Sequence, residues 1–405
     1  MTANGSRRPR LLVLNQYYWP GKEATANLLA ELCEELAGAY DVTVVTGATE
    51  GQPYRLTRNG VTIIRVRSTS YDRTQLWRRA ANYFTYLLGA IREAMTTARP
   101  DVVVAMTDPP FIGAAAQVVA KRFRAPLVVI TQDVFPEIAV KLGRLKNPLV
   151  IGLLGVVIAS YLRFADRVVV IGETMRRRIV AKGVAPDRIR VISNWGDAAA
   201  IRPLPRDNRW ARKHGLVDKF VVMHFGNVGH AQDLDTLIRA TTLLRDLDDL
   251  VVPIIGVGAR LDELKALAET VEAEAVRFLP WQEYGRRAEP ISSADLHVVG
   301  LARGLAGYVV PSRMWGVLAA GRPVIAAAED ESETAAVVRA TGCGVVVPPG
   351  NPLRLAEAIR ACHDGVFDLA DMGRRARAHA EAETDRSTAV ARYRAVLDEL
   401  IDRGP

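Results

Sequence analysis

Residues Phe220 to Ile238, FVVMHFGNVGHAQDLDTLI, change their hydrophobic period in the middle of the stretch. The apolar run that ends at Phe225 is typical of a buried strand, and the residues after Asp233 follow helical spacing. Gly226 and Gly229 separate the two patterns, where glycine lets the backbone turn tightly and lets a phosphate approach the main chain. The stretch therefore predicts a strand, a glycine turn and an amphipathic helix, the repeating unit of a parallel α/β sheet.

The same alternation extends in both directions along the 405 residues. Before this stretch, strands are expected at Leu11–Leu14, Val42–Thr46, Val102–Ala105, Leu127–Ile130, Val168–Ile171 and Ile189–Ile192. From this stretch onward, they are expected at Phe220–Phe225, Val252–Ile255, Val276–Leu279, Leu296–Val299, Val324–Ala327 and Gly344–Val347. Between the two series, Asp197–Trp210 contains two prolines and no periodicity, which favours a linker.

The predicted architecture is therefore two Rossmann-like α/β domains that share a cleft. The N-terminal domain is expected at residues 1–196, the linker at 197–210 and the C-terminal domain at 211–384. Residues 385–405 are expected to form a C-terminal helix that returns to the N-terminal domain.

Composition predicts a globular, cytoplasmic protein. Apolar residues make up 49% of the chain, and its first apolar run, Leu11–Leu14, is too short for a signal peptide. Cys33, Cys343 and Cys362 lie far apart without metal-ligand spacing, so free thiols are expected. Residues 1–200 carry 27 Lys+Arg against 16 Asp+Glu, whereas the remainder carries 26 against 29. This basic excess favours an anionic surface or acceptor, and the lack of a recognised binding motif argues against nucleic acid.

Two segments of the first half raise the question of membrane contact. Pro148–Leu162 has an apolar core of about 14 residues, short of the roughly 20 that span a bilayer, which favours a buried or interfacial helix. Arg73–Met95 mixes arginines with aromatic and aliphatic residues. That mixture suits a basic amphipathic helix on an anionic membrane, and equally a core helix with a charged outer face.

Candidate ligand-binding residues follow the strands of the second series. Gly226 and Gly229 lie at the end of its first strand, where such sheets bind ligands, whereas Gly256 and Gly258 favour only a tight turn. Trp281 follows a third strand and suits stacking on an aromatic base, with core packing as the alternative. In VPSRMWGVLAAGRPVIA (Val310–Ala326), Ser312 predicts a helix N-cap, and Arg313 and the first-turn N–H groups suit an anion.

In the first half, Pro20 and Gly21 follow the first strand, and Gln132, Asp133 and Glu137 follow a later one. A carboxylate at the end of a strand can orient an acceptor hydroxyl or accept its proton, and it can equally cap a helix. No Ser-His-Asp or Cys-His arrangement and no metal-binding pattern is found in the sequence. We therefore expect no bound metal and no other cofactor.

From about residue 10 to residue 400, the chain resembles the family-four retaining glycosyltransferases of the GT-B fold, especially the branch that builds bacterial surface polysaccharides. The resemblance is carried by NQYYWPG, TQDVFPEIAVKLG, VIGETMRRRIVAKGVAPDRIRVISNWGD, FGNVGHAQDLDTL, VPSRMWGVLAAGRPVIA and DESETAAVVRATGCGVVVPPGN. It implies a nucleotide-sugar donor in the second domain, an acceptor in the first and transfer with retention.

The resemblance also assigns roles to further positions. It implies donor contacts at Glu333 and acceptor contacts at Asn194. Where the family has two glutamates eight positions apart, this chain has Tyr308 and Gly316. The family's phosphate-binding Arg and Lys fall at Asn227 and Gln232, and its His-Asp pair reads Gln132-Asp133.

The sequence therefore predicts a glycosyltransferase that uses Arg313, Asp133 and Gln132 and acts at the inner membrane face on a lipid-linked or saccharide acceptor. A catalytically silent binding or regulatory subunit, favoured by Tyr308 and Gly316, and a nucleotide-sugar epimerase are the alternatives.

Overall fold

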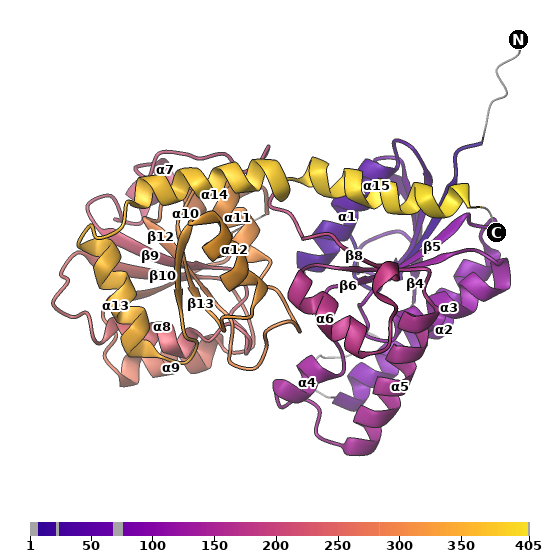
Figure 1. Ribbon diagram of the computed structural model, residues 1–405, viewed down its shortest axis with the longest axis horizontal. Coiled ribbons are helices and arrows are strands. Elements are labelled where there is room, and N and C mark those ends of the chain that lie inside the picture. The colour runs from indigo at the N-terminus through magenta and orange to yellow at the C-terminus, as the bar shows by residue number, and fades with distance from the viewer. Residues whose placement is uncertain (1–6, 22–23, 68–75, 283, 404–405) are drawn as a thin grey trace, which may run out of the picture. The chain divides into compact units, whose positions relative to one another are not determined.

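The computed structural model describes residues 7–21, 24–67, 76–282 and 284–403 and divides the chain into two compact units (Figure 1). The first unit is Met1–Ile192 together with Val390–Pro405, and the second is Ser193–Ala389. All twelve strands expected from the sequence are present, with ends that differ by at most two residues.

The first unit is built on an eight-stranded sheet in the order β3-β4-β2-β1-β5-β6-β7-β8. Its strands are β1 Arg10–Leu14, β2 Asp41–Gly47, β3 Arg55–Arg58, β4 Val61–Val66, β5 Val102–Met106, β6 Leu127–Thr131, β7 Arg167–Val170 and β8 Ile189–Val191. Every neighbouring pair is parallel except β3 and β4. The central strands are buried on both faces, which explains their continuous Val, Leu and Ile runs.

Strands β3 and β4 were not expected from the sequence. They form an antiparallel hairpin in which Arg58 is opposite Val61, leaving Asn59 and Gly60 as a two-residue loop. Both loop residues have positive φ, 46° and 80°, as a type I′ turn requires. Asn-Gly between two β-rich runs is the local signal that the sequence analysis missed.

The helices of the first unit are α1 Ala24–Leu36, α2 Leu76–Thr96, α3 Ile112–Phe123, α4 Glu137–Lys141, α5 Pro148–Phe164, α6 Glu173–Ala181 and the short 3₁₀ helix Pro186–Arg188. Helix α5 begins at a capping residue, because the Asn147 side chain accepts hydrogen bonds from the N–H groups of Leu149 (3.0 Å) and Val150 (3.3 Å). Of the expected amphipathic segment Arg73–Met95, residues 73–75 lie outside the described ranges.

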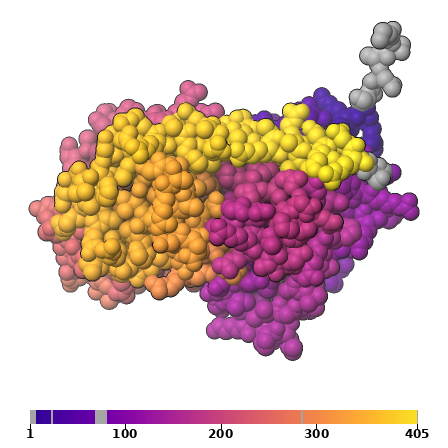
Figure 2. All heavy atoms as spheres, in the orientation of Figure 1, coloured from indigo at the N-terminus to yellow at the C-terminus, as the bar shows by residue number. Residues whose placement is uncertain are grey.

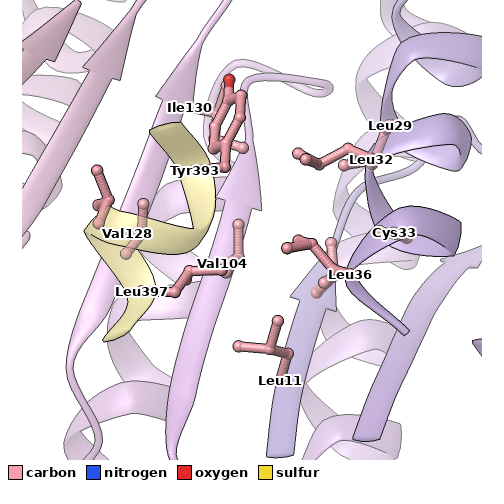
Figure 3. Close-up of a pocket in the computed structure, with 12 residues that line it drawn as sticks. Leu11, Leu29, Leu32, Cys33, Leu36, Val104, Val128, Ile130, Tyr393 and Leu397 are labelled. Atoms are coloured by element: carbon pink, nitrogen blue, oxygen red, sulfur yellow. The ribbon is translucent and has the colours of Figure 1, made fainter. Parts of the chain in front are cut away.

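The last helix, α15 (Arg386–Asp402), packs on the first unit from Val390 onward. Tyr393 and Leu397 lie against an apolar cavity whose other walls are β-strands and α1, with Leu11, Val104 and Leu29 among its lining residues (Figure 3). Polar contacts also hold α15 on the first unit: the Tyr40 hydroxyl donates to Asp398, and Arg167 pairs with Glu399.

The second unit has a six-stranded parallel sheet in the order β11-β10-β9-β12-β13-β14. Its strands are β9 Phe220–Phe225, β10 Leu250–Ile255, β11 Val276–Leu279, β12 Leu296–Gly300, β13 Val324–Ala327 and β14 Gly344–Val347. Its helices are α7 Arg209–Lys213, α8 Leu234–Thr241, α9 Leu261–Thr270, the 3₁₀ helix Tyr284–Arg286, α10 Ala288–Ser292, α11 Arg313–Ala319, α12 Glu333–Thr341, α13 Pro352–His363 and α14 Leu369–Glu383.

Residues 197–210, expected as a linker, pack within this second unit. Ile201 is buried, and Arg206 forms an ion pair with Asp295 (2.7 Å). The chain leaves the first unit earlier than the sequence analysis placed the boundary, at Ile192.

Candidate functional site

The turn after β9 is held against the turn after β10. The Gly226 N–H donates to the Ile255 carbonyl (2.9 Å), and Gly226 has φ +144°, a conformation that side chains rarely allow. A Cβ on Gly256 would lie 1.8 Å from the Gly226 oxygen, and one on Gly258 would lie 2.1 Å from the Val228 oxygen. Gly256 and Gly258 therefore serve close backbone packing, the tight turn that the sequence favoured.

Arg313 reaches the same turn from the first residue of α11. Its side chain crosses the open face of Gly226, since a Cβ there would lie 3.6 Å from the Arg313 Nε. The Arg313 Nη1 donates to His224 Nδ1 (3.1 Å), and the His224 Nε2 lies 3.3 Å from the Asn227 carbonyl. One tautomer satisfies both contacts: the neutral imidazole, which accepts at Nδ1 and donates at Nε2.

Electrostatics support that neutral form. Burial, with the charge of Arg313 adding to it, holds the pKa of His224 well below its ordinary value. Burial lowers the pKa of Arg313 to about 10, which leaves the guanidinium charged at neutral pH. Within the described residues, no Asp or Glu pairs with Arg313. A partly buried cation that has a neutral imidazole and no carboxylate beside it, within the described ranges, is suited to bind an anion.

The Gln232 side chain is hydrogen-bonded within the turn, and the Asn227 side chain lies close to Gly229. The Gly229 N–H donates to the Gln232 side-chain oxygen (2.9 Å), and a Cβ on Gly229 would lie 2.8 Å from the Asn227 amide nitrogen. Neither residue supplies the positive charge that the family resemblance leads one to expect at these positions. Arg313 brings a positive charge to this turn.

The remaining predicted donor residues lie at the same, carboxyl, edge of the sheet. Tyr308 follows β12, Glu333 opens α12 after β13, and Trp281 follows β11. The Trp281 ring is 6.1 Å from the Phe225 ring and is partly exposed, which leaves it available for stacking. Ser312 occupies the N-cap position of α11, as expected, but its φ and ψ are helical and its hydroxyl makes no capping hydrogen bond.

Of two further predicted positions, Gly316 lies within α11 and Asn194 lies near the start of the second unit. A Cβ on Gly316 would meet Ile201 and Ile291 methyl groups at 3.6 and 3.8 Å, so this position faces apolar side chains. Asn194, expected to contact the acceptor, is buried in the second unit. Gly196, two residues on, packs so tightly on α11 that a Cβ would lie 2.1 Å from the Trp315 oxygen.

In the first unit, three loops meet at the carboxyl edge of the sheet. Gln132 is buried, and its N–H donates to the Thr107 hydroxyl (3.1 Å). The Gln16 N–H, next to the turn that contains Pro20 and Gly21, donates to the Asp108 carbonyl (2.8 Å). These hydrogen bonds join the loops after β1, β5 and β6.

Asp133 lies among these loops, and its carboxyl group has a raised pKa. Burial, reinforced by the Asp108 carboxylate, raises the pKa of Asp133 to about 7. Asp133 lines a small pocket with Thr131, Tyr161 and Lys182, and the Lys182 ammonium pairs with Glu137 (2.6 Å). A carboxyl group with a pKa near neutrality exchanges a proton readily at physiological pH, as acid–base catalysis requires.

Metal-ligating residues do not gather at either site. Across the described ranges, no group of three or more His, Cys, Asp or Glu side chains is arranged to hold a metal ion. The three cysteines are buried and free. No described helix is long and apolar enough to cross a bilayer.

Comparison with known proteins matches both units. Residues 24–195 match the family described as Glycosyl transferase 4-like domain, and residues 207–379 match Glycosyl transferases group 1. The chain is a glycosyltransferase of the GT-B fold.

Relatives of this glycosyltransferase span most of its length. It is 26% identical over 377 residues to the probable glycosyltransferase WbjE of Pseudomonas aeruginosa, covering 90% of this chain and 91% of the relative. It is 27% identical over 269 residues to the putative colanic acid biosynthesis glycosyl transferase WcaI of Escherichia coli K12, covering 65% and 66%. The crystal structure of Anabaena HepE in complex with UDP-glucose has a TM-score of 0.76 at 17% identity, covering 96% and 100%.

His224 is the site residue of this glycosyltransferase that sequence reasoning missed. Its only local signal is a polar ring at the end of the otherwise apolar strand β9, FVVMHF. The partner, Arg313, is 89 residues further along the chain, so no local pattern connects the two.

Proposed function

We propose that this glycosyltransferase moves a sugar from a nucleotide-sugar donor to a lipid-linked or saccharide acceptor in bacterial cell-envelope glycan synthesis. The observation that carries the proposal is the Arg313 guanidinium, positioned over Gly226 by the neutral His224 ring. Developing negative charge on a departing diphosphate is stabilised by a cation and backbone N–H groups that are already in place.

The donor is proposed to bind at the carboxyl edge of the second sheet. Arg313 and the Gly226–Gly229 turn suit the diphosphate, and Trp281 suits the base. Structures of HepE with UDP and with UDP-glucose support a nucleotide-sugar donor, since their fold covers nearly all of this chain.

The acceptor is proposed to bind at the carboxyl edge of the first sheet, with Asp133 orienting the attacking hydroxyl or accepting its proton. The names of WcaI and of the lipopolysaccharide glycosyltransferase WaaG support a surface-glycan acceptor. A lipid-linked acceptor would place the enzyme at the inner, cytoplasmic face of an anionic membrane, in keeping with the basic excess of residues 1–200.

Retention and metal independence complete the proposal. The acceptor hydroxyl is proposed to attack from the face that the diphosphate leaves, with Arg313 and the turn amides stabilising the leaving group. No general base on the opposite face of the sugar is then required. No cofactor is expected.

The test is a panel of nucleotide sugars that differ in base and sugar, screened by thermal stabilisation. The wild-type protein is expected to melt at a higher temperature with one donor, and Arg313→Gln is expected to lose that shift. Arg354→Gln, an exposed arginine on α13, is the matched control and should keep it. A donor that stabilises both variants equally would contradict the assignment of Arg313.

A further inference from the structure

The N-terminal half of α5 exposes apolar side chains on the surface of the first unit. Leu149, Leu153 and Val156 recur at helical spacing and are 81%, 66% and 69% exposed. Val150 on the same helix and Val140 on α4 are 40% and 38% exposed. Figures 1 and 2 show α4 and the beginning of α5 projecting from the rest of the first unit. We call residues 140–156 the α4–α5 tip.

Only positive charges accompany this apolar surface in the sequence. From Ile138 to Ala165 there is no Asp or Glu, whereas Lys141, Arg144, Lys146 and Arg163 are basic. Lys141, Arg144 and Lys146 are exposed and precede the exposed leucines directly. Apolar side chains bordered by cations are the pattern of a surface that enters the headgroup region of an anionic bilayer.

The neighbouring helices α2 and α3 also expose apolar side chains. Helix α3 packs against both α2 and α5. On α2, Phe84 and Leu88 are 61% and 55% exposed, and Val118 on α3 is 49% exposed. Exposed apolar side chains therefore occur on three helices of which α3 contacts the other two.

We propose that the α4–α5 tip is a membrane-docking surface that inserts its leucines among anionic lipid headgroups. A second copy of the chain fits this surface less well, because a symmetric contact would bring the basic residues of both copies together. The proposal rests on the proposed function in one respect: docking would bring a lipid-linked acceptor close to the acceptor site. Binding to vesicles is measured without donor, acceptor or turnover, so it can fail or succeed independently of that function.

The experiment is vesicle flotation with the full chain, using phosphatidylcholine vesicles with and without phosphatidylglycerol. The wild-type protein is expected to float with the anionic vesicles and to be released by high salt. The double variant Leu149→Gln/Leu153→Gln is expected to bind the anionic vesicles at least about tenfold more weakly, because it buries less apolar surface in the bilayer.

The matched control is Leu243→Gln/Leu353→Gln, which changes two exposed leucines of the second unit and should float like the wild type. Thermal melts of all three proteins check that each is folded. Wild-type protein that stays soluble with both vesicle types would overturn the proposal, as would equal flotation of the double variant. A wild-type dimer that the double variant converts to monomer would assign the surface to a second copy instead.

Discussion

Replacing Arg313 by Gln is expected to weaken donor binding without lowering the free energy of unfolding. The pKa of Arg313 is lowered to about 10 from 12.5, so folding disfavours its charged form. At about 1.4 kcal/mol for each pKa unit, the charge destabilises the fold by up to ~3 kcal/mol, and solvent contact reduces that value. The hydrogen bond to His224 stabilises the fold by about 1 kcal/mol. Arg313→Gln should therefore leave the free energy of unfolding unchanged or raise it by up to ~2 kcal/mol.

Donor affinity is expected to move in the opposite direction. Loss of a charge-assisted hydrogen bond costs about 1.5–3 kcal/mol, which corresponds to a roughly 10- to 150-fold weaker donor complex. Chemical denaturation of the free protein measures the first effect, and calorimetric titration with the donor found by thermal screening measures the second. A variant that unfolds more easily by over ~1 kcal/mol and binds the donor as tightly as the wild type would refute the reasoning, since Arg313 would then be a structural residue.

Further expectations concern packing, acidity and chemistry. Gly316→Ala should stabilise the fold by about 0.5–1 kcal/mol, because the added Cβ has room in α11. Gly196→Ala should destabilise the fold strongly, because the added Cβ would collide with the Trp315 carbonyl. Equal denaturation midpoints for the two variants would count against this packing. Asp133→Asn should raise the melting temperature by an amount that grows as pH rises from 4 to 7, because the folded state holds the Asp133 proton up to a pKa of about 7 while the unfolded state releases it earlier; a gain that is the same at pH 5 and pH 8 would contradict that pKa. Leu397→Ala should cost about 2–5 kcal/mol of stability by enlarging the cavity under α15, and an unaltered denaturation midpoint would show that the cavity collapses. Transfer should continue in excess EDTA and give a retained anomeric centre by NMR; chelation that abolishes activity until Mg²⁺ or Mn²⁺ is added, or an inverted product, would refute these expectations.

Much of the fold was predictable because it depends on local patterns. The continuous apolar runs of β9 and β10 are long enough to be recognised singly, and their order along the chain predicts parallel pairing. Strand β3 is a four-residue edge strand with alternating burial, and Thr62 and Arg65 interrupt the apolar run of β4, so neither strand has the continuous apolar run of β10.

The site was predictable only where one residue carries the signal. Arg313 and Asp133 follow recognisable turns, but their pKa values depend on burial and on neighbours that the sequence does not reveal. The contact between His224 and Arg313 joins the end of strand β9 to the first residue of helix α11, two elements that are far apart in the sequence. Ser312 has a preferred capping side chain and lies at the N-cap position, yet its dihedrals are helical and its hydroxyl makes no capping hydrogen bond.

The return of α15 to the first unit has a consequence for synthesis on the ribosome. Residues 193–389 are contiguous and can complete their unit as soon as they emerge, whereas the first unit receives its final segment only from Val390 onward. At 5–20 residues per second, roughly 10–40 s separate the emergence of β8 from that of Tyr393 and Leu397. During that interval Leu11, Leu29 and Val104 lack their covering helix, so a nascent chain is expected to engage chaperones through this apolar face and to release them when α15 docks.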